Sequence, residues 1–162
     1  MNDNKNYCCF IGSGNLYENR FFLTGEINGV KFCKGHAFPL GATYFGNEMV
    51  NFSINSSTAT SCTLVLYHEG EAEPYVEITI PNEFKIGDNY SIMVFGLNIE
   101  NTEYGYKFDG EYNPAKALLF DKNRVLLDPY AKLISGNEIW GKPAYKNTSF
   151  PMRGCILQTD YD

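Results

Sequence analysis

The sequence has no long apolar run and few of the residues that build catalytic or metal sites. No stretch approaches the about 20 apolar residues that a membrane-spanning helix needs. Only two histidines, His36 and His68, occur among the 162 residues. Cys33 and His36 have the spacing of half a metal site, but no second pair completes it, so His36 is interpreted as a loop residue. We therefore predict no metal, no cofactor and no catalytic residue in this chain.

A cysteine pattern typical of disulfide-bonded proteins is also missing. The chain has five cysteines, an odd number, and none of them forms a CxxC pair. Such a set indicates a reducing compartment rather than a disulfide framework. Residues 1–6 are polar and include an acid, so they lack the basic and apolar regions of a secretory signal. We predict a cytoplasmic protein.

Positive charge is in deficit as well. Thirteen Lys and Arg residues stand against nineteen Asp and Glu residues, which gives a formal net charge of −6. An acidic chain repels phosphate backbones and anionic lipid, so neither nucleic acid nor a membrane is predicted as a partner. The acids lie mainly at turns or exposed strand positions, as in residues 69–73, and none marks a catalytic carboxylate pair.

Short strand signals are abundant. Residues 20–33 predict a β-hairpin around Asn28 and Gly29, because this residue pair favours the positive φ angles of a type I′ turn. Residues 50–55 alternate apolar and polar side chains and predict a half-buried strand. Further strands are predicted over residues 62–67, 76–80, 90–95 and 104–108. Many short strands at regular spacing predict an all-β fold, an antiparallel β-sandwich.

The pattern changes toward both ends of the chain. Residues 1–18 are polar without periodicity and are predicted to be a flexible lead-in. Residues 19–141 are assigned to the sandwich, including a short helix over residues 114–120 with proline in its first turn. Glycines and prolines interrupt residues 135–154, at Gly136, Gly141, Pro143, Pro151 and Gly154, so residues 142–162 are predicted to be an irregular linker.

Aromatic residues are numerous and include twelve Tyr, twelve Phe and one Trp. The apolar faces of sugar rings stack on flat aromatic side chains. Seven side chains were weighed as candidates: Tyr67, Tyr75, Tyr90, Tyr104, Tyr106, Tyr112 and Trp140. Aromatics that recur with period two usually pack in a core, so core packing competes with sugar binding for each of them. Tyr90 and Trp140 are the carbohydrate-binding candidates that we retain.

Four motifs occur in order along the chain: PLGAT at 39–43 with VNFSI at 50–54, TLVLY at 63–67, EYGYKFDGEYNP at 103–114 and LLDPYAK at 126–132. Together they resemble the isoamylase-type debranching enzymes of glycoside hydrolase family 13. The resemblance covers about residues 38–141, and Trp140 stands where a tryptophan often follows in that family.

The resemblance implies an immunoglobulin-like sandwich, counted among the carbohydrate-binding modules of family 48, in front of a catalytic (β/α)₈ barrel. Those enzymes hydrolyse α-1,6 branch points of glycogen, amylopectin or pullulan. Their nucleophile and general acid lie in the barrel, so no catalytic residue is carried over to this chain. Residues 142–162 would then lead into the barrel. Tyr90 stands at the position of a family tryptophan that serves as a sugar platform in glycogen-binding relatives.

Two functions of different classes follow from these features. The first is a non-catalytic N-terminal module of an α-1,6-glucan debranching hydrolase, which packs on its own barrel and has α-glucan as a second partner. This hypothesis predicts an exposed apolar patch where the barrel docks, with five residues in the core or the interface: Tyr104, Tyr106, Leu126, Leu127 and Tyr130. The alternative is a stand-alone β-sandwich that binds a protein partner.

Overall fold

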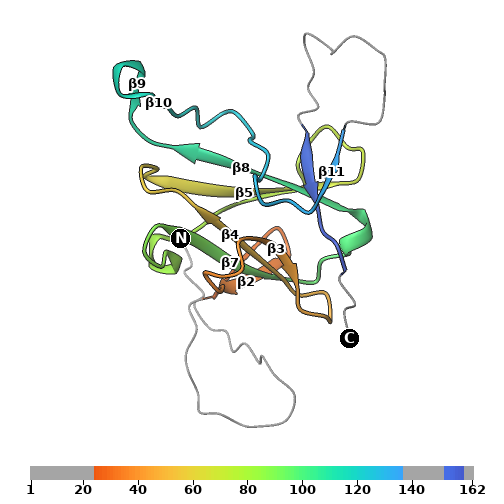
Figure 1. Ribbon diagram of the computed structural model, residues 1–162. Coiled ribbons are helices and arrows are strands. Elements are labelled where there is room, and N and C mark those ends of the chain that lie inside the picture. Colours follow the sequence, from red (N-terminus) through yellow and green to blue (C-terminus); the bar gives the residue numbers. More distant parts are fainter. Residues whose placement is uncertain (1–23, 137–151, 159–162) are drawn as a thin grey trace.

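Two antiparallel five-stranded sheets pack against each other in the computed structural model, which describes residues 24–136 and 152–158 (Figure 1). The first sheet has the order β1 (Thr24–Ile27), β2 (Val30–Lys34), β7 (Asn89–Phe95), β4 (Val50–Asn55), β3 (Gly41–Tyr44). The second has the order β11 (Leu133–Ser135), β12 (Arg153–Cys155), β8 (Thr102–Asp109), β5 (Ser61–His68), β6 (Val76–Thr79). The prediction of an all-β, immunoglobulin-like antiparallel sandwich is confirmed.

Shorter elements complete the described part of the chain. A two-stranded hairpin of β9 (Tyr112–Asn113) and β10 (Leu118–Leu119) extends beyond β8. Three single-turn 3₁₀ helices lie at η1 (Asn82–Phe84), η2 (Ile99–Asn101) and η3 (Pro114–Lys116). No helix in residues 24–136 or 152–158 is long and apolar enough to cross a membrane.

The predicted hairpin turn is confirmed. Ile27 pairs with Val30 across the turn, and Asn28 and Gly29 have φ angles of 51° and 80°. These are the positive values that a two-residue type I′ turn requires.

The core forms from alternate residues of facing strands, as the period-two pattern predicts. Leu64, Leu66 and Tyr104 from the second sheet are fully buried together with Phe52 and Ile92 from the first. The rings of Phe52 and Tyr104 meet edge to face with centroids 5.0 Å apart, so an aromatic contact joins the two sheets.

The prediction that residues 50–55 form a half-buried strand was wrong about burial. Asn51 and Ser53 face away from the core, yet both are fully buried, because the segment from Gly35 to Ala37 crosses over them. Asn51 accepts from His36 N (2.8 Å) and donates to His36 O (3.0 Å), while Ser53 Oγ donates to Ala37 O (2.7 Å). The polar side chains of this strand therefore hold a covering segment instead of facing water.

The predicted helix over residues 114–120 is a single 3₁₀ turn. Pro114 occupies its start as expected, but Ala117 takes a left-handed φ of 56°, which ends the turn. Leu118 and Leu119 then pair back with Asn113 and Tyr112. Local hairpin pairing has therefore replaced helix propagation.

The predicted linker 142–162 contains a strand of the sandwich. Gly154 and Cys155 of β12 pair with Tyr104 and Glu103 of β8, and Ile156 is buried in the core. The sandwich therefore continues to at least residue 156. The lead-in predicted at residues 1–18 lies outside the described residues.

Candidate functional site

Tyr90 lies in the core, so it does not form the predicted sugar platform. Only 1% of the residue is exposed, and its hydroxyl donates a hydrogen bond to Ala59 O at 2.9 Å. Lys85 Nζ lies 4.7 Å from the ring centroid. A buried ring offers no face to a sugar, so we withdraw Tyr90 as a stacking residue. Trp140 lies outside the described residues, and its role stays a prediction.

The outer face of the second sheet carries a row of polar side chains. The register places Thr63 of β5 between Thr79 of β6 and Lys107 of β8. The hydroxyl oxygens of Thr63 and Thr79 lie 3.1 Å apart, and Lys107 Nζ bonds Glu77 Oε1 at 2.6 Å. These side chains stand together because residues of one parity on neighbouring strands share a face of a sheet.

This row forms the floor of an open groove of about 480 Å³. Lys122 and Asn123, from the segment that follows β10, contribute to its wall, as does Asp109 at the end of β8. The groove therefore presents hydroxyl, ammonium, carboxylate and amide groups. Such a mixed set of donors and acceptors suits a neutral, polyhydroxylated ligand.

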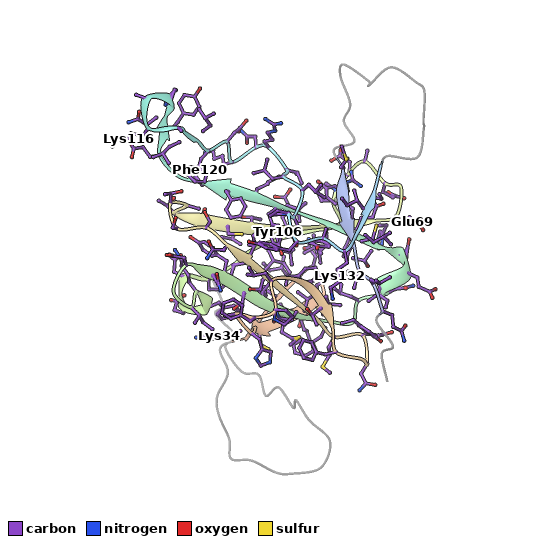
Figure 2. The ribbon with its side chains drawn as sticks, in the orientation of Figure 1. Lys34, Glu69, Tyr106, Lys116, Phe120 and Lys132 are labelled. Carbon is purple, nitrogen blue, oxygen red and sulfur yellow. The ribbon has the colours of Figure 1, made fainter. Side chains whose placement is uncertain are left out.

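A hollow of about 250 Å³ that is lined mostly by apolar residues adjoins the groove, and Phe108 lines both. Its walls include Leu118, Phe120 and Leu126. Figure 2 places Phe120 at the root of the β9–β10 hairpin and Lys116 at its far end. Gly110 is required at this root, because a Cβ there would lie 2.6 Å from Cδ2 of Phe120. The groove and the hollow together provide polar and apolar contacts side by side.

The most exposed aromatic ring near the groove is that of Tyr112. It is 69% exposed on β9, three residues beyond Asp109, and is paired with the 65% exposed Leu119 of β10. Sequence reasoning included Tyr112 in the wider aromatic set but did not retain it. Core packing was the competing interpretation for all of these tyrosines, whereas β8 ends at Asp109 and leaves Tyr112 exposed beyond it.

Three of the sequence motifs meet at a second place, where the two sheets join. Tyr104 on β8 donates its hydroxyl proton to Asp128 Oδ2 at 2.8 Å, and Tyr130 N donates to Asp128 Oδ1 at 2.8 Å. Gly41, at the start of β3, packs against the backbone carbonyl of Tyr130. Residues 41, 104 and 128–130 therefore form one structural junction, which explains why the motifs occur together in the sequence.

The junction is buried, and burial shifts the pKa values of its ionisable groups. Asp128 is 1% exposed, and burial raises the pKa of its carboxyl, opposed by the bonds from Tyr130 and Tyr104. Burial also raises the pKa of Tyr104 and of the neighbouring Tyr106. The Tyr106 hydroxyl has no hydrogen-bond partner among the described residues. These groups serve packing, because no open surface reaches them.

A third polar cluster holds β12 in the second sheet. Arg153 is 2% exposed, and its guanidinium lies 3.5 Å from the ring centroid of Tyr67. One guanidinium nitrogen donates to Glu71 O (2.6 Å) and to Glu103 Oε2 (3.1 Å). Sequence reasoning missed this cluster, because Arg153 and Glu103 lie 50 residues apart and neither carries a local strand signal.

The described residues contain no group of three or more metal-binding side chains. Within that part of the chain, the groove, the hollow and Tyr112 have the chemistry of a ligand site.

The chain is similar in sequence to a known protein family and to several of its members. Residues 39–131 match the family described as carbohydrate-binding module 48 (isoamylase N-terminal domain). The chain is 29% identical over 149 residues to the chloroplastic isoamylase SU1 of Zea mays, covering 90% of this chain and 18% of that protein. It is 37% identical over 102 residues to the glycogen debranching enzyme of Serratia proteamaculans, covering 63% of this chain and 14% of that enzyme.

Among solved structures, the pullulanase of Bacillus acidopullulyticus aligns with a TM-score of 0.53 at 22% identity. That alignment covers 74% of this chain and 12% of the pullulanase, and it supports the fold alone. The chain spans less than a fifth of the length of these relatives.

Proposed function

Because the chain belongs to the carbohydrate-binding module 48 family, the isoamylase N-terminal domain, we propose that it is the non-catalytic N-terminal module of an α-1,6-glucan debranching hydrolase. The carrying observation is that the family match, residues 39–131, covers strands β3 to β10 of the sandwich. The named relatives are an isoamylase and a glycogen debranching enzyme, and the module corresponds to only 18% and 14% of their lengths. Catalysis belongs in this proposal to the remaining part.

We further propose that α-glucan contacts the outer face of the second sheet. A glucose unit has hydroxyl groups at its rim and apolar C–H groups on its faces, so it needs polar partners and an apolar platform together. Thr63, Thr79 and Lys107 offer the first, and the hollow beside Phe108 with the exposed Tyr112 ring offers the second. Contact here would hold a branched chain near the catalytic part and raise its effective concentration.

Titration with a branched maltooligosaccharide tests the glucan proposal. Binding would be followed through intrinsic tyrosine and tryptophan fluorescence, in wild type and in Tyr112→Ala, Lys107→Ala and Trp140→Ala. We expect saturable binding that weakens at least about tenfold in Tyr112→Ala, as the loss of one stacked aromatic implies. Trp140→Ala tests the prediction for that residue independently.

A matched control is Tyr130→Ala, since Tyr130 is also exposed, at 46%, but contacts Gly41 of the first sheet. Equal losses of sugar affinity in the Tyr112→Ala and Tyr130→Ala variants would argue against glucan binding at the groove. If wild type binds no sugar up to millimolar concentration, glucan contact is excluded and the packing role remains. Debranching activity in the longest natural form of the protein tests the parent enzyme separately.

The cytoplasm is the compartment that we propose. The core thiol of Cys62 is free and fully buried, and it is compatible with a reducing environment. The maize relative is named chloroplastic. Fractionation of cells that express the protein, with detection in the soluble cytoplasmic pool, would decide between the cytoplasm and another location.

A further inference from the structure

Exposed apolar side chains concentrate on the ribbon formed by β11 and β12. Eleven large hydrophobic residues are exposed in the described part of the chain, and five of them lie within residues 130–134 and 152–157. Four belong to the ribbon and its immediate flanks, and we call them the ribbon patch: Leu133 (49%), Ile134 (44%), Met152 (49%) and Leu157 (41%).

The β11 strand of the ribbon is exposed on both of its faces. Leu133 and Ile134 are consecutive residues of one strand, so their side chains point to opposite faces of the sheet. Both are nevertheless exposed, which means that this strand buries neither face. β11 is also the outermost strand of the second sheet, so its outer backbone edge is unpaired in the described structure. Figure 1 shows the ribbon at one side of the molecule, away from the β9–β10 hairpin.

The ribbon is nonetheless firmly anchored. Arg153 is buried against Tyr67 and Glu103, and Ile156 joins the core cluster. Gly154 packs on the ring of Tyr104, and β11 pairs with β12 at three positions. An apolar surface that is held rigidly loses little conformational entropy when a partner covers it. This combination is typical of a preformed interface rather than of a frayed edge.

We propose that the ribbon patch is the surface on which the catalytic part of the same polypeptide packs. The inference rests on the proposed function, which supplies the occupant: more than four fifths of the length of these curated relatives lies outside the segment that this chain matches. An apolar edge strand left open in a free protein invites aggregation, so it is normally covered by another element. A linked domain covers it at high effective concentration.

A second copy of the chain fits the patch less well. β11 has only three residues, so edge-to-edge pairing between separate chains would form a very short ladder. The net charge of −6 also opposes association of two identical chains.

Hydrogen exchange in two forms of the protein tests the proposal. The 162-residue chain and the longest natural form would be compared over peptides that contain residues 130–136 and 152–158. We expect amide exchange in these peptides to be at least about tenfold slower in the longer form. Ile134→Lys should abolish the added protection, because a lysine cannot be buried at an apolar contact without loss. Leu119→Lys, at a leucine of the β9–β10 hairpin that is more exposed than Ile134, should leave the added protection intact.

Other results of these experiments would overturn either this proposal or the proposed function. Equal exchange in the two forms overturns the proposal, as does a natural protein that ends at residue 162. Protection that grows with the concentration of the 162-residue chain, together with a dimer in sedimentation that Ile134→Lys abolishes, would make a second copy the occupant and overturn it too. A longer form that debranches glycogen normally but shows no added protection refutes this inference alone. A longer form without hydrolase activity refutes the proposed function.

Discussion

The guanidinium of Arg153 lies 3.1 Å from a carboxylate oxygen of Glu103, and the two side chains are 2% and 8% exposed. The pair is covered on one side by Tyr67 and bonded to the carbonyl of Glu71 in the loop before β6. Slipping β12 by one residue would turn Arg153 to the other face of the sheet. The ion pair therefore fixes the register of the strand that enters last in the sequence.

Replacing Arg153 with methionine should destabilise the sandwich strongly. The change leaves the carboxylate of Glu103 buried without its counter-charge, which costs about 3–5 kcal/mol in comparable cases. The measurement is urea denaturation of wild type and variant. The double variant Arg153→Met with Glu103→Leu should recover much of that loss, because no buried charge then remains. Arg124→Met, at an exposed position, is the control, and a similar loss there would contradict the argument.

Two neighbouring tyrosines should respond differently to loss of their hydroxyls. Tyr104→Phe removes the donor to Asp128 and leaves a buried carboxylate oxygen short of a partner, at a cost of about 1–3 kcal/mol. Tyr106→Phe removes a buried hydroxyl that has no partner among the described residues, so it should be neutral or stabilising. Chemical denaturation compares the two variants, and equal destabilisation would refute the assignment of the hydrogen bond.

Asp128 should stabilise the folded protein less as the pH rises, whereas an acid whose pKa is lowered by folding stabilises it more. Burial raises the pKa of its carboxyl in the folded state above its value in the unfolded chain, so the folded state holds the proton more strongly. Its contribution is fully present below the unfolded pKa of about 4 and is lost as pH rises through the folded pKa. Asp128→Asn removes this titration.

The difference in unfolding free energy between wild type and Asp128→Asn should therefore fall as the pH rises above about 4. Denaturation at several pH values measures this difference and cancels the contributions of the other acids. A difference that rises with pH would mean that the hydrogen bonds from Tyr104 and Tyr130 outweigh burial and lower the pKa instead.

Gly41→Ala should destabilise the junction between the sheets. Gly41 has a φ of 93°, and an added Cβ would lie 2.8 Å from the carbonyl oxygen of Tyr130. Gly29→Ala is the matched control, because Gly29 also has a positive φ, 80°, but its Cβ would meet open space. We expect a backbone cost of about 1–3 kcal/mol in both and a further loss in Gly41→Ala. Equal decreases in melting temperature for Gly41→Ala and Gly29→Ala would contradict a tight contact between Gly41 and Tyr130.

Local sequence chemistry predicted most of the described strands. Asn28 and Gly29 specified their turn, and the alternation in residues 62–67 and 104–108 specified two central strands, because these signals act between near neighbours. What failed depends on partners remote in sequence. Arg153 to Cys155 has no apolar alternation, and its place as a strand follows from Glu103 and Tyr67.

The candidate site was harder to predict than the fold. Thr63, Glu77 and Lys107 come from three strands, and only the register of those strands brings them together. Tyr90 was misjudged because its strand position fits either a core or a surface ring, and burial is decided by the opposing sheet. The hydroxyl of Tyr90 found its partner, Ala59, through tertiary packing.

The position of β12 between β8 and β11 has a consequence for the order in which the protein folds. The counter-charge of Glu103 lies 50 residues later in the sequence. The neighbour of β11 in the sheet is β12, which follows it in the sequence. Contacts so distant in sequence form slowly, since a long loop must close first. On the ribosome, the second sheet would therefore remain open along one side until the end of this segment has been synthesised, and the last strand would complete it from within.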